Sequence, residues 1–230
     1  MTLDPRPTLV IGTHNRKKGV ELADLLAPWG FHVLTLDDFP NALEVAEDGE
    51  SFAANAALKA TQQARHLGHW VLADDSGLAV DAFGGAPGMF SARFAGPNAS
   101  DEDNNRRLLA DLGNTPLEKR TAHYVCHVTV ADPTGAIRAE SHDVCHGRIR
   151  FQPAGTNGFG YDPLFEVIEY HHTFGELGPH AKRALSHRSR SLRSILPKLP
   201  PAACGVAPQR PPPSPRGWPK ILAETPAQLC

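Results

Sequence analysis

The order of the predicted elements indicates an α/β fold with a mixed sheet. In the first half of the chain, short apolar segments that suit buried strands alternate with helical patterns, an order that favours parallel strands. Two long strand-like segments, 121–131 and 137–149, then follow each other across the turn sequence Asp132-Pro133-Thr134-Gly135, which indicates an antiparallel hairpin. A chain that contains both kinds of pairing requires a mixed sheet.

The first elements are marked by apolar patterns and by the residues that end them. Residues 7–11 predict a short buried strand, and a helical pattern follows over 16–26. Residues 31–36 suit a second strand. Good helix formers fill 51–67, and Gly68 then ends this second helix.

The later elements are predicted in the same way. Residues 70–73 and 78–82 suit two short strands. Ser100 with Asp103 approximates a capping box and so predicts the start of a helix. Residues 179–196 read as one or two basic helices.

The composition suggests an ordinary globular protein. Of the 230 residues, 41% are hydrophobic and 21% are charged. No apolar segment approaches the roughly 20 residues that span a bilayer, and the N-terminus lacks the pattern of a signal peptide. The four cysteines are far apart, which argues against a disulfide scaffold or a cysteine zinc site. We therefore expect a cytoplasmic protein with no membrane association.

Charge and proline are distributed unevenly along the chain. Residues 178–230 carry nine Lys or Arg and one acid, and ten of the 21 prolines lie within 197–230. Proline clusters exclude helices and central strands. The sequence predicts a folded domain over 1–199 and a Pro-rich, disordered tail over 200–230.

A basic segment lies between the first strand and the first helix. Such a junction offers free N–H groups and the positive end of a helix dipole, which suit phosphate. Because positive charge disfavours a helix start, the three bases there suggest another role. A plain helix cap with solvated bases stays an alternative. The candidate phosphate-binding residues are Thr13, His14, Asn15, Arg16, Lys17 and Lys18.

Two adjacent carboxylates, Asp74 and Asp75, follow the strand at 70–73 and precede Ser76. Neighbouring carboxylates repel each other unless a cation or hydrogen-bond donors lie close by. Mg²⁺ could take this place, since one or two carboxylates and substrate phosphates hold it in many enzymes. A carboxylate could also activate water as a general base. The alternative is a local turn.

Two further segments suit nucleotide recognition. The glycine-rich stretch 155–163 contains Phe159, Gly160, Tyr161 and Asp162, where an aromatic ring could stack on a base. Lys182, His187 and Arg188 lie further on, and a guanidinium recognises keto oxygens well. Taken alone, a glycine-rich turn explains the first segment equally well, and an exposed basic helix explains the second segment better.

Four separated segments together match one family pattern. They are T-x-N-x-x-K at 13–18; A-D-D-S-G-L at 73–78 with G-G-A-P-G at 84–88 and S-A-R at 91–93; G-F-G-Y-D-P at 158–163; and S-H-R at 186–188. In this order they resemble the inosine triphosphate pyrophosphatase family, also called dITP/XTP pyrophosphatases. The likeness covers about 8–199.

The resemblance implies an elongated, two-lobed fold with a central mixed sheet and an active-site cleft between the lobes. It implies a homodimer that hydrolyses deaminated purine nucleoside triphosphates (ITP, dITP and XTP) to the monophosphate and pyrophosphate. Mg²⁺ is the expected cofactor, with Mn²⁺ as an alternative. Two positions depart from the pattern: His14 replaces a common glycine, and Ala54 replaces the glutamate of F-x-E-N-A.

The resemblance also assigns roles to the candidate residues. Asp75 would activate water with Asp74 as its neighbour, and Lys18 would hold the triphosphate together with the other residues of 13–18. Glu47, from an acidic loop, would join Asp75 in binding the metal. Phe159 would stack on the base. The remaining residues of the sugar and base pocket would be Ser76, Gly160, Tyr161, Asp162, Lys182, His187 and Arg188.

Two alternatives compete with this assignment. One is a protein that keeps the cleft but has lost catalysis, and that uses the basic C-terminal region to bind nucleic acid. We do not favour it, because Lys18, Asp74 and Asp75 are all present. The other is an enzyme of similar fold that acts on a modified pyrimidine triphosphate, as Maf-like pyrophosphatases do. The S-H-R and F-G-Y-D segments favour a purine.

Overall fold

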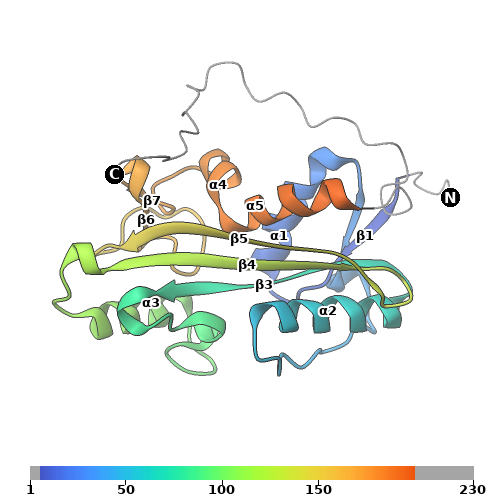
Figure 1. Cartoon of the computed structure of the whole chain (residues 1–230), viewed down its shortest axis with the longest axis horizontal. Coiled ribbons are helices and arrows are strands. Elements are labelled where there is room, and N and C mark those ends of the chain that lie inside the picture. Colours follow the sequence, from blue (N-terminus) through green and yellow to red (C-terminus); the bar gives the residue numbers. More distant parts are fainter. Residues whose placement is uncertain (1–5, 200–230) are drawn as a thin grey trace, which may run out of the picture.

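A computed structural model describes residues 6–199, which form one seven-stranded mixed sheet with helices on both faces (Figure 1). The strand order is β2-β1-β3-β4-β5-β6-β7. β1 (Thr8–Ile11) pairs in parallel with β2 (His32–Thr35) and β3 (Trp70–Val80), and all later pairs are antiparallel. The predicted α/β fold with a mixed sheet is confirmed. The predicted tail, 200–230, lies outside the described residues.

β3 is one continuous strand of 11 residues, so the prediction of two short strands at 70–73 and 78–82 was wrong. Its residues Val71–Val80 pair without a break with β4 (Thr121–Ala131). Gly77 lies within this strand, and the position requires glycine because a Cβ there would collide with the carbonyl oxygen of Gly88.

The long hairpin has the predicted bounds. β4 and β5 (Ile137–Ile149) pair from Thr121 opposite Arg148 to Ala131 opposite Ile137. Two short strands, β6 (Phe165–Val167) and β7 (His172–Thr173), extend the sheet beyond β5. The sequence did not predict them, since two or three residues are too few to display an alternating pattern.

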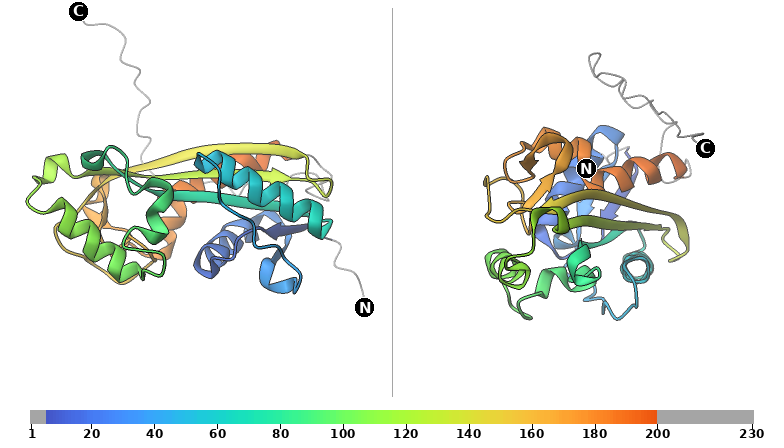
Figure 2. Two further views of the ribbon diagram at one scale, coloured as in Figure 1. Left: turned by 90° about the horizontal axis from the view of Figure 1, so that it is seen from below. Right: turned by 60° about the vertical axis from the view of Figure 1, so that its left-hand side comes forward.

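Within residues 6–199, five α-helices cover the sheet. α2 (Phe52–Leu67) and α3 (Asp101–Leu112) lie on one face, whereas α1 (Arg16–Leu26), α4 (Pro179–Leu185) and α5 (His187–Ile195) lie on the other (Figures 1 and 2). Two of these helices have the capping residues that the sequence predicted. Gly68 ends α2 in the left-handed conformation, and Ser100 and Asp103 form both bonds of a capping box at α3. Ser51, which was expected as the first residue of the helix, instead caps α2.

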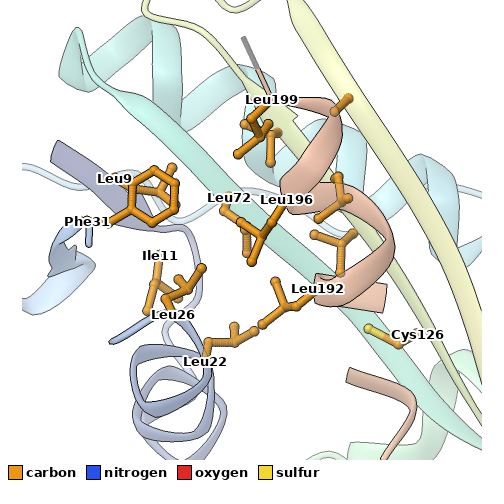
Figure 3. Close-up of a cluster of buried hydrophobic side chains, with 14 residues drawn as sticks. Leu9, Ile11, Leu22, Leu26, Phe31, Leu72, Cys126, Leu192, Leu196 and Leu199 are labelled. Carbon is orange, nitrogen blue, oxygen red and sulfur yellow. The ribbon is translucent and has the colours of Figure 1, made fainter. Parts of the chain in front are cut away.

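In the described part of the chain, the buried side chains form three clusters along the sheet. One lies between α1, α5 and the strands β1, β3 and β4 (Figure 3). A second lies under α2 on the opposite face. The third lies around Leu108, Tyr124 and Phe165, towards the β5–β6–β7 edge. No helix within 6–199 has the length and apolar character needed to cross a membrane.

Candidate active site

A cavity of about 290 Å³ opens where β1 ends, beside the middle of β3. β1 stops opposite Leu72, where the N–H of Gly12 donates to the Leu72 carbonyl at 2.8 Å. Beyond that point, β1 no longer pairs with this edge of β3. Since neighbouring strand residues point to opposite faces, side chains from both faces of β3 can contribute to one site. The location follows the rule that α/β sheets bind ligands at the carboxyl ends of parallel strands.

Asp74 lies on the face of β3 that α1 and α5 cover, and it is fully buried. Its Oδ2 accepts from Arg188 Nε at 3.1 Å and from Ser76 Oγ at 2.9 Å, and lies 3.6 Å from Lys18 Nζ. Burial alone would raise the pKa of Asp74, but Lys18 and Arg188 outweigh it and hold this pKa well below its usual range. Asp74 therefore stays charged and anchors two cations of the site.

Asp75 points to the opposite face, towards α2. Lys59 Nζ lies 3.2 Å from Asp75 Oδ1 and 3.4 Å from Glu47 Oε1, and Asn55 Nδ2 donates to Asp75 Oδ2 at 3.3 Å. Burial raises the pKa of Asp75, and the opposing effects of Lys59 and Lys18 do not cancel that shift. A carboxylate with a raised pKa is a stronger base than an ordinary one.

Lys59 keeps its charge in this buried position. Burial would lower the pKa of Lys59, but Asp75, Asp74 and Glu47 together raise it. Asp75 and Glu47 thus converge on one cation, here an ammonium group. No group of three or more His, Cys, Asp or Glu forms a metal site within 6–199. Two converging carboxylates nevertheless fit Mg²⁺, which keeps several waters and takes its other ligands from substrate phosphates.

The loop after β1 and the first turn of α1 contribute four of the six candidate phosphate-binding residues to the cavity: Thr13, His14, Asn15 and Lys18. Asn15 caps α1, since its Oδ1 accepts from the N–H of Lys18 at 3.1 Å. His14 Nε2 donates to the Leu43 carbonyl at 2.9 Å, so the histidine is accommodated against the loop before α2.

Arg16 and Lys17 do not line the cavity. Lys17 instead pairs with Asp101, at 2.6 Å between Nζ and Oδ2. The same Asp101 oxygen accepts from the N–H of Gly160 at 3.0 Å, and Asn105 Nδ2 donates to the Gly160 carbonyl at 2.9 Å. The first turns of α3 therefore hold the glycine-rich loop at the edge of the cavity.

Phe159 lies beside two cations. Its ring centre is 4.5 Å from Lys182 Nζ and 5.5 Å from the Arg188 guanidinium carbon. Asp162 fixes this group, because its Oδ2 accepts from Lys182 Nζ at 2.6 Å and from the N–H of Phe159 at 2.8 Å. Gly158 must be glycine here, since its φ is 76° and a Cβ would collide with Asp162.

His187 is a neutral donor or acceptor at the first position of α5. Its ring stacks on Tyr124 with centres 4.6 Å apart, and its Nδ1 has no partner among the described residues. Burial, together with Arg188 and Lys182, holds the pKa of His187 well below its usual range. Tyr161 also lines the cavity, and its hydroxyl donates to the Ser91 carbonyl at 2.8 Å.

Three residues that contribute to the site were not predicted from the sequence. Lys59 had a usable signal, because it lies on the buried, alanine-rich face of α2 next to Ala56 and Ala60. Glu21 is one turn beyond Lys18 and accepts from Arg188 Nη1 at 2.6 Å. Asp101 had no local signal for its contact with Gly160.

The mixed sheet defines an α/β protein. Its cavity contains cations and carboxylates around a buried aspartate pair, and this arrangement suits a phosphorylated ligand. The chain belongs to the Ham1 family, which it matches over residues 9–198.

Several relatives are similar over most of the chain. A dITP/XTP pyrophosphatase from Rhodopirellula baltica is 53% identical over 83% of this chain and 92% of its own length. One from Exiguobacterium sp. is 50% identical over 81% of this chain and 94% of its own. Among solved structures, the Ham1 protein of Staphylococcus aureus has a TM-score of 0.71 and 36% identity, with 81% of this chain and 95% of that one covered. A nucleoside-triphosphatase / dITP/XTP pyrophosphatase from Mycobacterium abscessus has a TM-score of 0.66 and 40% identity, with 83% and 99% covered.

Proposed function

We propose that this protein hydrolyses deaminated purine nucleoside triphosphates (ITP, dITP and XTP) to the monophosphate and pyrophosphate, and so removes them from the nucleotide pool. The observation that carries the proposal is the carboxylate pair of β3. Asp75 offers a proton acceptor on one face of the strand. Asp74, on the other face, anchors Lys18 and Arg188, the cations proposed to bind the phosphates and the nucleobase. The relatives with this name and about 50% identity support the substrate class.

Asp75 is the proposed general base. It removes a proton from a water molecule, whose oxygen then attacks the α-phosphorus while the bond to the leaving pyrophosphate breaks. The raised pKa of Asp75 supports this role. Lys18 and the loop at Thr13 and Asn15 neutralise and position the phosphates, because phosphoryl transfer depends mainly on positioning and charge stabilisation.

Glu47 and Asp75 would hold Mg²⁺, with Mn²⁺ as an alternative. When bound, the metal supplies charge neutralisation and polarises phosphate oxygens. The contact of both carboxylates with Lys59 supports this pair, since a cation is already stabilised there.

Base selectivity is proposed to come from Phe159, Lys182 and Arg188. Inosine and xanthine carry a keto oxygen at position 6, where adenine carries an amino group. Donors such as the Arg188 guanidinium pair with the keto group and leave a donor facing a donor when adenine enters. Sites built on buried hydrogen bonds can reject such mismatches by several orders of magnitude.

Pyrophosphate release from ITP, XTP, GTP and ATP, with Mg²⁺ and with EDTA, tests the proposal. We expect metal-dependent release from ITP and XTP far above that from GTP and ATP. Asp75→Asn should abolish it, whereas Asp111→Asn, an exposed carboxylate on α3, should not. Release from none of the four would instead favour a nucleotide-binding protein without catalysis.

Two further features remain proposals that rest on the family resemblance. We propose a homodimer, which sedimentation velocity would test. We also propose action in the cytoplasm, where nucleotide pools are used, and fractionation of cells with an antibody against the chain would test this.

A further inference from the structure

One cation of the cavity is not used by the proposed mechanism. Among the described residues, five lysine and arginine side chains line the cavity: Lys18, Lys59, Arg93, Lys182 and Arg188. Four of these form ion pairs with carboxylates. Arg93 forms none with any described residue, and its guanidinium carbon lies 5.2 Å from the ring centre of Phe90. Arg93 is therefore the lining cation whose charge is left uncompensated.

The main chain beside Arg93 is firmly held, although the side chain is exposed. Arg93 ends the 3₁₀ helix η4 (Gly88–Arg93). The Tyr161 hydroxyl donates to the Ser91 carbonyl at 2.8 Å, and Asn104 Nδ2 donates to the Ala92 carbonyl at 3.1 Å. Because the backbone that carries Arg93 is held, binding of an anion needs to order only the side chain.

The wall that carries Arg93 is connected to the catalytic end of the cavity. Met89, also on η4, has its Sδ 3.9 Å from Asn55 Nδ2, and Asn55 donates to Asp75. The nucleobase contacts lie with Phe159 and α5. In the proposed binding mode the triphosphate extends from the base towards Asp75, and η4 then borders the phosphates through Met89 and Asn55.

We propose that Arg93 is a further substrate-binding residue, whose guanidinium binds oxygens of the β- and γ-phosphates and then of the leaving pyrophosphate. This inference rests on the proposed function for the identity of the substrate. A guanidinium suits the role because its planar set of donors matches phosphate oxygens in pairs. By binding charge that develops on the leaving group, Arg93 also lowers the barrier to α–β bond cleavage.

The test combines direct binding with kinetics. Pyrophosphate is titrated calorimetrically into the full-length wild-type protein and into three variants, Arg93→Ala, Arg93→Lys and Arg106→Ala. Arg106 is the control, because it is an exposed arginine of α3 that lies outside the cavity. Arg93→Ala should weaken pyrophosphate binding and lower kcat/KM for ITP by about 10- to 100-fold, the effect of losing one charge-assisted hydrogen bond. Arg93→Lys should recover part of this loss, and Arg106→Ala should behave as wild type.

A further variant tests whether the role of Arg93 is only to pack against the ring of Phe90. Phe90→Leu removes the ring but keeps Arg93, so pyrophosphate binding should persist. Unchanged pyrophosphate affinity in folded Arg93→Ala would overturn the inference, as would a loss confined to the ITP-over-ATP preference. Wild-type turnover of ITP tests the proposed function independently, and the pyrophosphate titration stays informative even without turnover.

Discussion

The two adjacent aspartates of β3 are expected to respond in opposite ways to the same substitution. Asp74→Asn leaves Lys18 and Arg188 without their shared buried carboxylate. Removing one partner of a buried ion pair costs about 3–5 kcal/mol. Because Arg188 keeps Glu21 at 2.6 Å and the Lys18 side chain stays 16% exposed, we take the lower end, about 3 kcal/mol. At about 2–4 °C per kcal/mol for a domain of this size, the Tm should fall by about 6–12 °C.

Asp75→Asn should leave stability unchanged or increase it slightly. The raised pKa of Asp75 means that its ionised form is disfavoured by folding, so a neutral amide removes an unfavourable charge. Turnover should nevertheless vanish. A residue that costs stability while performing the chemistry is the usual sign of an active-site trade-off.

The pH dependence gives a second readout. The pKa of Asp74 is lower in the folded than in the unfolded protein, so its stabilisation is present above the unfolded value of about 3.9 and is lost as pH falls below it. The Tm difference between wild type and Asp74→Asn should be constant near neutral pH and shrink in acid. Thermal unfolding followed by circular dichroism measures both effects. A Tm of Asp74→Asn within 2 °C of wild type, or an equal loss in Asp75→Asn, would refute the reasoning.

Three further outcomes follow from the site. Lys59→Met should raise the pKa of Asp75 and move the acidic limb of the kcat/KM profile to higher pH; a move to lower pH would contradict the ion pair. Asn105→Ala removes the bond to the Gly160 carbonyl and should raise the KM for ITP about 3- to 10-fold with kcat nearly unchanged, as steady-state kinetics would show. Ala54→Glu restores a carboxylate beside the loop of the proposed metal ligand and should raise activity at limiting Mg²⁺; identical Mg²⁺ titrations would count against this.

The sequence predicted those parts of the fold that are encoded locally. Gly68 and Ser100 mark helix ends through bonds within one turn, and the hairpin bounds follow from two long strand patterns around one turn sequence. The continuity of β3 could not be read in this way, because adjacent aspartates in a strand are tolerated only when cations from distant elements lie on both faces.

The site shows the same difference between features encoded locally and features that depend on tertiary contacts. Motif residues from α1, β3 and α5 come together as expected around Asp74. Arg16 and Lys17 separate from Lys18 because neighbouring helix residues point about 100° apart, and a pattern of three bases does not say which one faces the cavity. Lys59 was missed although the alanine-rich face of α2 indicates its position, whereas the contact between Asp101 and Gly160 depends on tertiary packing that a single sequence does not display.

The long β4 strand has a consequence for how this protein folds. Tyr124 packs in the cluster near the β5–β6–β7 edge, while Cys126, two residues further on, packs in the cluster of α1 and α5. The two ends of the molecule therefore share one strand rather than a linker. Opening either end would expose β4 along its length, so the ends behave as one cooperative unit, with amide hydrogens of β4 exchanging only when the whole domain unfolds.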